Sequence, residues 1–280
     1  SYLVDFDGRA PKTTVGGTIN ADTTWTTENS PYIVTSDIVV NAGKTLTVMP
    51  GTRVYFSPGT GMTVNGTLDA RGPTPDSIHF GSRQEMLQPS TALPGDWEGI
   101  VLNGTGSSGS QLDYCSVVYA GAGANSAAIY LASSSAQITN SEVSFSSTRG
   151  LVADNPSGPV VASNSFVGNA GVPLSVGSAT AFQCTDNIGT GNADGNVIEI
   201  RSGDCIGDHT WHLNGLEYRV TGDIVVRSTA NGGTGTLTIE PGCTLRFAPS
   251  TGIYCGYSYY GWYFGKIVAD GTPEDPITFA

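Results

Sequence analysis

Two six-residue segments of this chain are nearly identical: residues 46–51 read LTVMPG, and residues 237–242 read LTIEPG. Each joins a short run with β-branched residues to a Pro-Gly step, a pattern typical of a strand that ends in a tight turn. The likeness extends outward, because many positions of residues 17–80 recur in order within residues 203–279. Self-similarity over such a length constrains architecture more than local propensity does. The sequence therefore predicts an internal duplication.

The matched positions include charged and aromatic residues as well as turn residues. Among those that recur are Asp22, Trp25, Tyr32 and residues 37–40, which return as Asp208, Trp211, Tyr218 and residues 223–226. Two insertions, at 227–236 and 254–263, interrupt the alignment, and both fall between expected strands, where added length is tolerated.

The middle segment, residues 81–202, has a shorter rhythm. Apolar triplets such as residues 99–101, 128–130 and 150–152 recur every ~22 to 28 residues, and a second row of apolar runs interleaves with them. This interval suits one coil of a parallel β-helix, in which each coil adds a strand to two or three parallel sheets. We expect an all-β, right-handed parallel β-helix: residues 1–202 form an N-terminal cap and body, with the first copy at 17–80 and stacked coils at 81–202, and residues 203–280 form a second, partial copy.

Asparagines accompany the coil rhythm. Asn140, Asn164 and Asn187 lie almost one coil apart, each near a turn. An internal asparagine ladder, in which stacked side-chain amides satisfy buried turn backbone, would explain the spacing, and three surface turn residues are the alternative.

The words that carry a family likeness are GTLDARG at residues 66–72, GDWEGI at 95–100 and DGTPEDPITF at 270–279. With the coil rhythm, they resemble the right-handed parallel β-helix repeat proteins of the pectate-lyase-like superfamily, in particular large secreted bacterial and archaeal surface proteins. The resemblance implies the fold and a secreted, extracellular or cell-surface location. It implies little about chemistry, because these words build turns and core positions.

The excess of acidic residues limits the classes of partner that the protein can bind. The chain has 12 Lys and Arg against 24 Asp and Glu, a formal net charge of −12, which disfavours nucleic acid and anionic membranes. No apolar run approaches the roughly 20 residues of a membrane-spanning helix, so we expect no membrane insertion. The start at Ser1 suggests a processed secreted product, and Asn65 and Asn103 head glycosylation sequons.

Five cysteines leave at least one thiol without a partner within the chain. Proximity in sequence suggests disulfides within the pairs Cys184/Cys205 and Cys243/Cys255, and the alternative is that the cysteines are free and buried. No Cys-x-x-Cys pair indicates zinc, and we expect no metal site and no cofactor, although weak calcium binding at the acidic surface is compatible with the composition.

No catalytic residues are predicted. The resemblance includes pectate lyases and polygalacturonases, but the Asn-Thr-Asp, Asp-Asp and Gly-His-Gly words that such hydrolases would show are absent. The carboxylates of the middle coils do not repeat at the coil interval, and basic residues are scarce there. His79 aligns with Thr278 of the second copy, which favours a replaceable strand position.

One segment adds chemistry to the repeat: residues 254–264 read YCGYSYYGWYF. Aromatic side chains of this density form either a contact surface or a small separate core. We expect the second copy to act as a docking element through candidates in this segment and the last strand: Tyr257, Tyr259, Tyr260, Trp262, Tyr263, Ile277 and Phe279.

The sequence therefore favours a non-catalytic extracellular structural or adhesive protein that associates with itself head to tail, as a surface layer, filament or adhesin subunit. The alternative is a β-helix that binds or cleaves polysaccharide, and cell-surface polysaccharide is a candidate partner in either case. Ice binding is a distant third, prompted by Thr-rich strands at residues 45–47 and 236–238.

Overall fold

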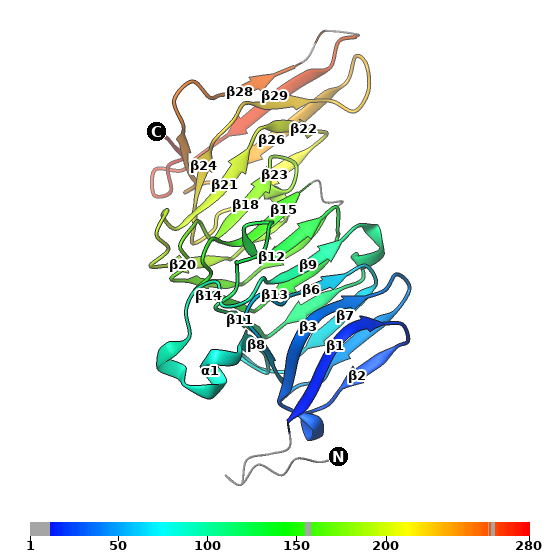
Figure 1. Ribbon diagram of the computed structural model, residues 1–280. Coiled ribbons are helices and arrows are strands. Elements are labelled where there is room, and N and C mark those ends of the chain that lie inside the picture. The colour runs from blue at the N-terminus through cyan, green and yellow to red at the C-terminus, as the bar shows by residue number, and fades with distance from the viewer. Residues whose placement is uncertain (1–11, 155–157, 257, 259–260) are drawn as a thin grey trace.

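The computed structural model of the protein describes residues 12–154, 158–256, 258 and 261–280. They form a parallel β-solenoid of about 9 turns (Figure 1). Every strand pair is parallel, so the predicted all-β parallel β-solenoid is confirmed. Connections that lead each strand around the axis, rather than hairpins, explain why the sequence shows short strands at coil intervals.

The body has three sheets that run along the axis. The first sheet contains the start of β3 (Tyr32–Val40), followed by β5 (Arg53–Phe56), β8 (Ile78–Ser82), β11 (Cys115–Val118), β14 (Glu142–Ser144), β17 (Ser165–Val167) and β20 (Ile188–Thr190). The second contains the end of β3, followed by β6 (Met62–Val64), β9 (Ile100–Asn103), β12 (Ala127–Ala132), β15 (Arg149–Asp154), β18 (Leu174–Gly177) and β21 (Val197–Arg201).

The third sheet of the body contains β2 (Thr23–Trp25), β4 (Thr45–Val48), β7 (Thr67–Arg71), β10 (Gln111–Asp113), β13 (Gln137–Thr139), β16 (Val160–Ala162) and β19 (Cys184–Thr185). The long strand β1 (Thr13–Ile19) pairs with both halves of β3 and so belongs to the first and second sheets. Short helices lie in the connections: η1 (Thr27–Asn29), α1 (Arg83–Leu87), η2 (Pro89–Thr91), η3 (Thr105–Ser107) and η4 (Ala181–Gln183).

The core fills the space between the three sheets. Strand residues alternate between inside and outside, as β5 illustrates: Val54 and Phe56 are fully buried, whereas Arg53 and Tyr55 face outward. Trp97, in the connection between β8 and β9, is fully buried and stacks on Phe56 with ring centroids 4.1 Å apart. Most of the buried core consists of Val, Ile, Leu and Ala, and burial of such apolar side chains is the dominant favourable term in folding.

The C-terminal segment adds coils in a new register. Here β24 (Glu217–Val220), β27 (Thr244–Phe247) and β30 (Thr278–Phe279) stack in turn on β21, whereas β22 (Gly203–Ile206), β25 (Ile224–Arg227) and β28 (Ile253–Cys255) form one small sheet, and β23 (His209–Trp211), β26 (Thr234–Ile239) and β29 (Phe264–Ala269) form another.

The two repeat copies are stacked with an offset of one sheet. In the first copy Tyr32 pairs within the first sheet, but the matching residue Tyr218 pairs with β21, which belongs to the second sheet of the body. The pairing of β21 with β24 runs across the expected boundary at residues 202/203, so the second sheet continues into the C-terminal segment.

Matched positions of the two copies make the same contacts. Trp25 stacks on Tyr32 with centroids 4.8 Å apart, and Trp211 stacks on Tyr218 at 5.2 Å. A carboxylate oxygen of Asp22 accepts a hydrogen bond from the N–H of Thr45 over 2.9 Å, and Asp208 accepts one from Thr236 over the same distance. These shared contacts support equivalence, and the origin of the copies by duplication stays a prediction.

Candidate functional site

Strand β8 differs from its neighbours in the first sheet because longer connections flank it on both sides. Along the body, the turn from the third to the first sheet is as short as Tyr114 alone, which has a positive φ of 54°. Before β8, however, the connection covers residues 72–77, and after β8 it covers residues 83–99 and contains α1 and η2. The two connections add side chains at both ends of one strand.

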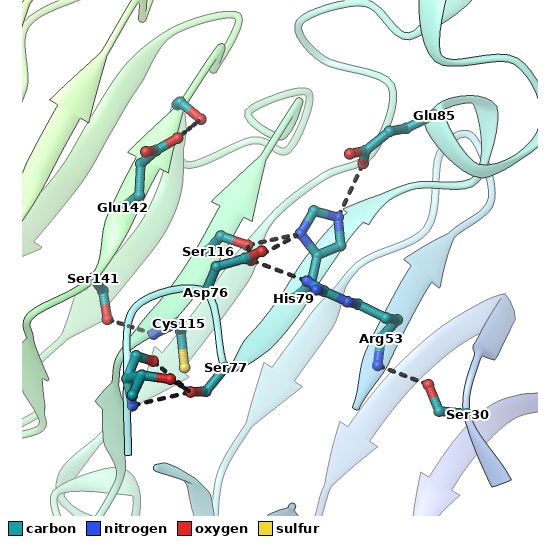
Figure 2. A network of polar contacts seen from close by, with 12 residues as sticks. Ser30, Arg53, Asp76, Ser77, His79, Glu85, Cys115, Ser116, Ser141 and Glu142 are labelled. Atoms are coloured by element: carbon teal, nitrogen blue, oxygen red, sulfur yellow. Dashed lines mark hydrogen bonds and ion pairs between the residues drawn. The ribbon is translucent and has the colours of Figure 1, made fainter. Parts of the chain in front are cut away.

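His79, on β8, is bonded to both connections (Figure 2). Its Nε2 lies 3.0 Å from Oε2 of Glu85 on α1, and its Nδ1 lies 2.7 Å from Oγ of Ser116 on β11. Ser116 Oγ donates to Oδ1 of Asp76, in the preceding connection, over 2.7 Å, and Nη1 of Arg53 on β5 donates to the same oxygen over 3.0 Å. We call these five residues the His79 network.

The charges of the network stabilise one another. Burial lowers the pKa of His79, which is only 7% exposed, but the carboxylates of Asp76 and Glu85 outweigh this effect, and the pKa is raised above its usual value. His79, whose Nδ1 lies 3.8 Å from Oδ1 of Asp76, and the hydrogen bonds from Arg53 and Ser116 hold the pKa of Asp76 well below its usual range. Below its raised pKa, His79 is an imidazolium between two carboxylates.

This arrangement brings together a serine, a histidine and carboxylates, yet it differs from a nucleophilic triad. An imidazolium has an N–H on both nitrogens, so Nδ1 donates to Ser116 Oγ and cannot accept its proton. The Ser116 proton is directed instead to Asp76. A nucleophilic serine needs the opposite, a neutral base positioned to take that proton.

The network borders a cleft of about 500 Å³ on the outer face of the first sheet. The lining residues come from four successive coils, and they are polar for the most part: Pro75, Asp76, His79, Cys115, Ser116, Val118, Asn140, Ser141, Glu142, Ser163 and Ser165. The carboxylate of Glu142 accepts a hydrogen bond from Ser144 over 2.8 Å. The cleft offers hydroxyl, amide and carboxylate groups in a row, as hydrogen bonding to a hydroxyl-rich ligand requires.

The second copy keeps the loop but lacks the network. Asp275 matches Asp76, and its N–H donates to Oγ1 of Thr272 over 2.9 Å. Thr278 stands at the position of His79, and Thr244 stands at that of Arg53. Since the loop closes without histidine or arginine there, those two residues serve something other than loop closure in the first copy. Sequence comparison took the same difference as a sign that His79 is replaceable, and it missed the network.

The structure places two of the three predicted asparagines in a ladder and the third outside it. Asn164 and Asn187 are buried, and Nδ2 of Asn164 donates to Oδ1 of Asn187 over 3.0 Å while that oxygen also accepts from the N–H of Asn164. The prediction is wrong for Asn140, which is exposed and has a φ of 49°. Its side-chain amide donates to Asp113. Its place in the stack belongs to the following residue, Ser141, whose N–H donates to Oδ1 of Asn164.

A second asparagine ladder was missed. Nδ2 of Asn169 donates to Oδ1 of Asn192 over 2.8 Å, and Nδ2 of Asn192 donates to Oδ1 of Asn196 over the same distance. Asn169 and Asn192 lie five residues after Asn164 and Asn187, at the next turn of the same coils. That fixed offset was a signal available in the sequence.

The suggested disulfides are also corrected. Cys184, Cys205, Cys243 and Cys255 are all free, as is Cys115. Four of the five thiols are buried, and only Cys255 is exposed. Buried cysteine fills narrow core positions as a small apolar side chain, which was the alternative interpretation of these residues.

The remaining candidates lie away from the cleft. Trp262 is 66% exposed, Phe279 is exposed, and Tyr263 and Ile277 are half-buried, whereas Tyr257, Tyr259 and Tyr260 lie outside the described residues. Of the sequon residues, Asn65 is half-buried and Asn103 is exposed, and Nδ2 of Asn103 donates to Oδ1 of Asn65 over 2.7 Å.

Among the residues that the structure describes, no group of three or more His, Cys, Asp or Glu side chains is arranged to hold a metal ion. No helix in this part of the chain has the length and apolar character needed to cross a membrane.

Comparisons with known proteins give one short, partial match. A segment of 56 residues, 20% of this chain, is 45% identical to part of Protein bark beetle of Drosophila melanogaster. The match spans 2% of the length of that relative. No family model matches the chain, and no solved structure matches it.

Proposed function

We propose that this protein is a non-catalytic, extracellular adhesive β-solenoid of the secreted pectate-lyase-like type, and that the cleft on its first sheet binds polysaccharide. The observation that carries the proposal is the His79 network, which fixes Asp76, His79 and Ser116 at one end of the cleft and engages both His79 nitrogens and the Ser116 proton in internal hydrogen bonds. A preorganised set of hydrogen-bonding groups favours binding, because less side-chain entropy is lost when the ligand arrives.

The charges of the network favour binding over catalysis. A general acid needs a carboxyl whose pKa is raised toward the working pH, whereas the pKa of Asp76 is strongly lowered. His79 is held as a charged donor between acceptors. Such a site supplies stable hydrogen bonds and does not transfer protons easily.

The test measures binding and cleavage together. The purified protein is titrated with a panel of neutral, acidic and amino oligosaccharides, and the products are assayed for new reducing ends and unsaturated sugars. Ser116→Ala and His79→Thr should weaken binding, and Thr47→Ala, on the outer face of the third sheet, serves as the matched control. Binding that survives both cleft substitutions, or cleavage that Ser116→Ala or Glu142→Gln abolishes, would overturn the proposal.

A second candidate, self-association, rests on the apolar side chains of the last coils. Tyr254, Trp262, Phe264 and Phe279 are each at least half exposed, and exposed clusters of aromatic residues are typical of contact surfaces. We infer head-to-tail contact between copies through these residues. Light scattering at high protein concentration should detect oligomers that Trp262→Ser with Phe279→Ser dissociates, and Leu93→Ser, at another exposed apolar residue, should leave them intact. A monomeric wild-type protein contradicts this candidate.

A further inference from the structure

We infer that the cleft prefers saccharides that carry protonated amino groups, and that Glu142 recognises the ammonium. The inference rests on the proposed function, since it names the ligand class of the same cleft. It follows from how the charges beside the cleft are paired, and the pairing differs between the two ends of the cleft.

At the β8 end, each cation already has an anionic partner. Arg53 pairs with Asp76 at 3.0 Å, and His79 contacts Glu85 at 3.0 Å. Neither guanidinium nor imidazolium is therefore available to a ligand carboxylate unless an existing ion pair is broken. Breaking the His79–Glu85 pair, whose side chains are 9% and 26% exposed, carries a larger penalty than a new exposed pair returns. Arg53, in the more exposed pair, is not among the residues that line the cleft.

At the β14 end, the charge is negative and its hydrogen-bonding partner is neutral. Glu142 is exposed, and its carboxylate is bonded to the hydroxyl of Ser144. Figure 2 shows Glu142 on its own strand, apart from the His79 network. Strands β8, β11 and β14 are successive neighbours, so two strand spacings, roughly 9.5 Å, separate Glu142 from the His79 strand.

The polar groups at the two ends of the cleft together favour one class of ligand. Hydroxyl groups of Ser116, Ser163 and Ser165 along the cleft suit the hydroxyls of a sugar chain. An ammonium at Glu142 gains a charge-assisted hydrogen bond, whereas a uronate there meets like charge, in a protein whose net charge is −12. A polymer of amino sugars satisfies both requirements, and a polymer of uronic acids fails the second.

The experiment compares three oligosaccharides of equal length: a glucosamine oligomer, its N-acetylated form and a galacturonic acid oligomer. Affinities are measured by calorimetry below the amine pKa, in chelator, so that divalent ions cannot bridge ligand and protein. The wild-type protein should bind the glucosamine oligomer most tightly and the galacturonic acid oligomer least. Glu142→Gln should reduce the preference for glucosamine over its N-acetylated form about two- to fivefold, the range of one exposed ion pair. Glu28→Gln, an exposed carboxylate on η1, is the matched control.

The outcomes separate this inference from the proposed function. If all three oligomers bind equally and Ser116→Ala weakens all of them, the cleft binds sugar but the amine preference is overturned. The amine preference is also overturned if Glu142→Gln leaves it unchanged or if the galacturonic acid oligomer binds best. If none of the three binds, the polysaccharide proposal fails, and the inference fails with it.

Discussion

His79 is a nearly buried histidine in a strongly acidic protein, and its contacts link α1 to the first sheet. The raised pKa of His79 means that the folded state binds this proton more tightly than the unfolded chain does. The resulting stabilisation is present in full below the unfolded pKa of about 6.5, and it is lost as the pH rises through the higher folded pKa. For Asp76, whose pKa is lowered, stabilisation is present above about 3.9 and is lost as the pH falls.

We therefore expect the His79 network to be most stabilising between about pH 4 and 6.5. Above that window, α1 should open more often, because Glu85 loses a charged partner; loss of such a bond is worth roughly 1 to 3 kcal/mol. Hydrogen exchange of residues 83–87, corrected for intrinsic rates, should accelerate as the pH rises. In His79→Thr, which installs the residue of the second copy, exchange should be fast throughout. A pH-independent wild type would contradict the assigned charge state.

The free cysteines allow a simple chemical check. Burial raises the pKa of Cys184 and Cys205 to about 12, so neither thiol forms the reactive thiolate at neutral pH. We expect one fast-reacting thiol, Cys255, in the native protein, and five after unfolding without reductant. Fewer than five thiols in the unfolded, unreduced protein would show a disulfide that the structure lacks.

At the scale of elements, the asparagine ladders join neighbouring turns. Oδ1 of Asn164 accepts from the backbone N–H of Ser141 in one coil, and its Nδ2 donates both to Asn187 and, over 2.8 Å, to the backbone carbonyl of Ile138. The turn backbone there is buried and cannot be satisfied by solvent. Without the amide, these groups would lack partners.

The ladders therefore predict a difference between asparagines that look alike in the sequence. Asn164→Ala should lower the free energy of unfolding by roughly 1 to 3 kcal/mol for each buried group left unsatisfied, and Asn169→Ala should behave similarly. Asn140→Ala, at an exposed turn residue, should change it by less than about 0.5 kcal/mol. Chemical denaturation measures all three. Equal effects at Asn140 and Asn164 would show that burial does not set the contribution.

The asparagine ladders also show how much of the structure can be predicted from the sequence. Coil spacing identified Asn164 and Asn187, because a buried amide must recur once per turn. It wrongly included Asn140, since a spacing that is off by one residue still resembles a period, and only Ser141 points inward there. The His79 network could not be predicted from the sequence. It joins residues of four different segments, Arg53, Asp76, Glu85 and Ser116, and no sequence period relates residues that meet through inserted connections.

At the scale of the whole molecule, the one-sheet offset between the copies matters for cooperativity. A solenoid is held together by contacts between neighbouring coils, and at the junction the first and third sheets of the body end at β20 and β19 while the second sheet continues through β21 and β24. Beyond the strands of the second sheet, an isolated bridge between Ile188 and Gly215 also crosses this junction. Fewer backbone hydrogen bonds between paired strands therefore connect the C-terminal coils to the body than connect neighbouring coils within the body.

We therefore expect Trp25 and Trp211 to report on two units that unfold separately. Both side chains are buried and stacked on a tyrosine, so replacing either by alanine should destabilise its own coils by roughly 3 to 5 kcal/mol. Trp211→Ala should expose residues 203–280 to hydrogen exchange while the cleft region stays protected, and Trp25→Ala should do the reverse. If either substitution unfolds the entire chain in one transition, the junction couples the copies as tightly as the coils within each copy. A negligible effect at either tryptophan would show that matched positions of the repeat are not structurally equivalent.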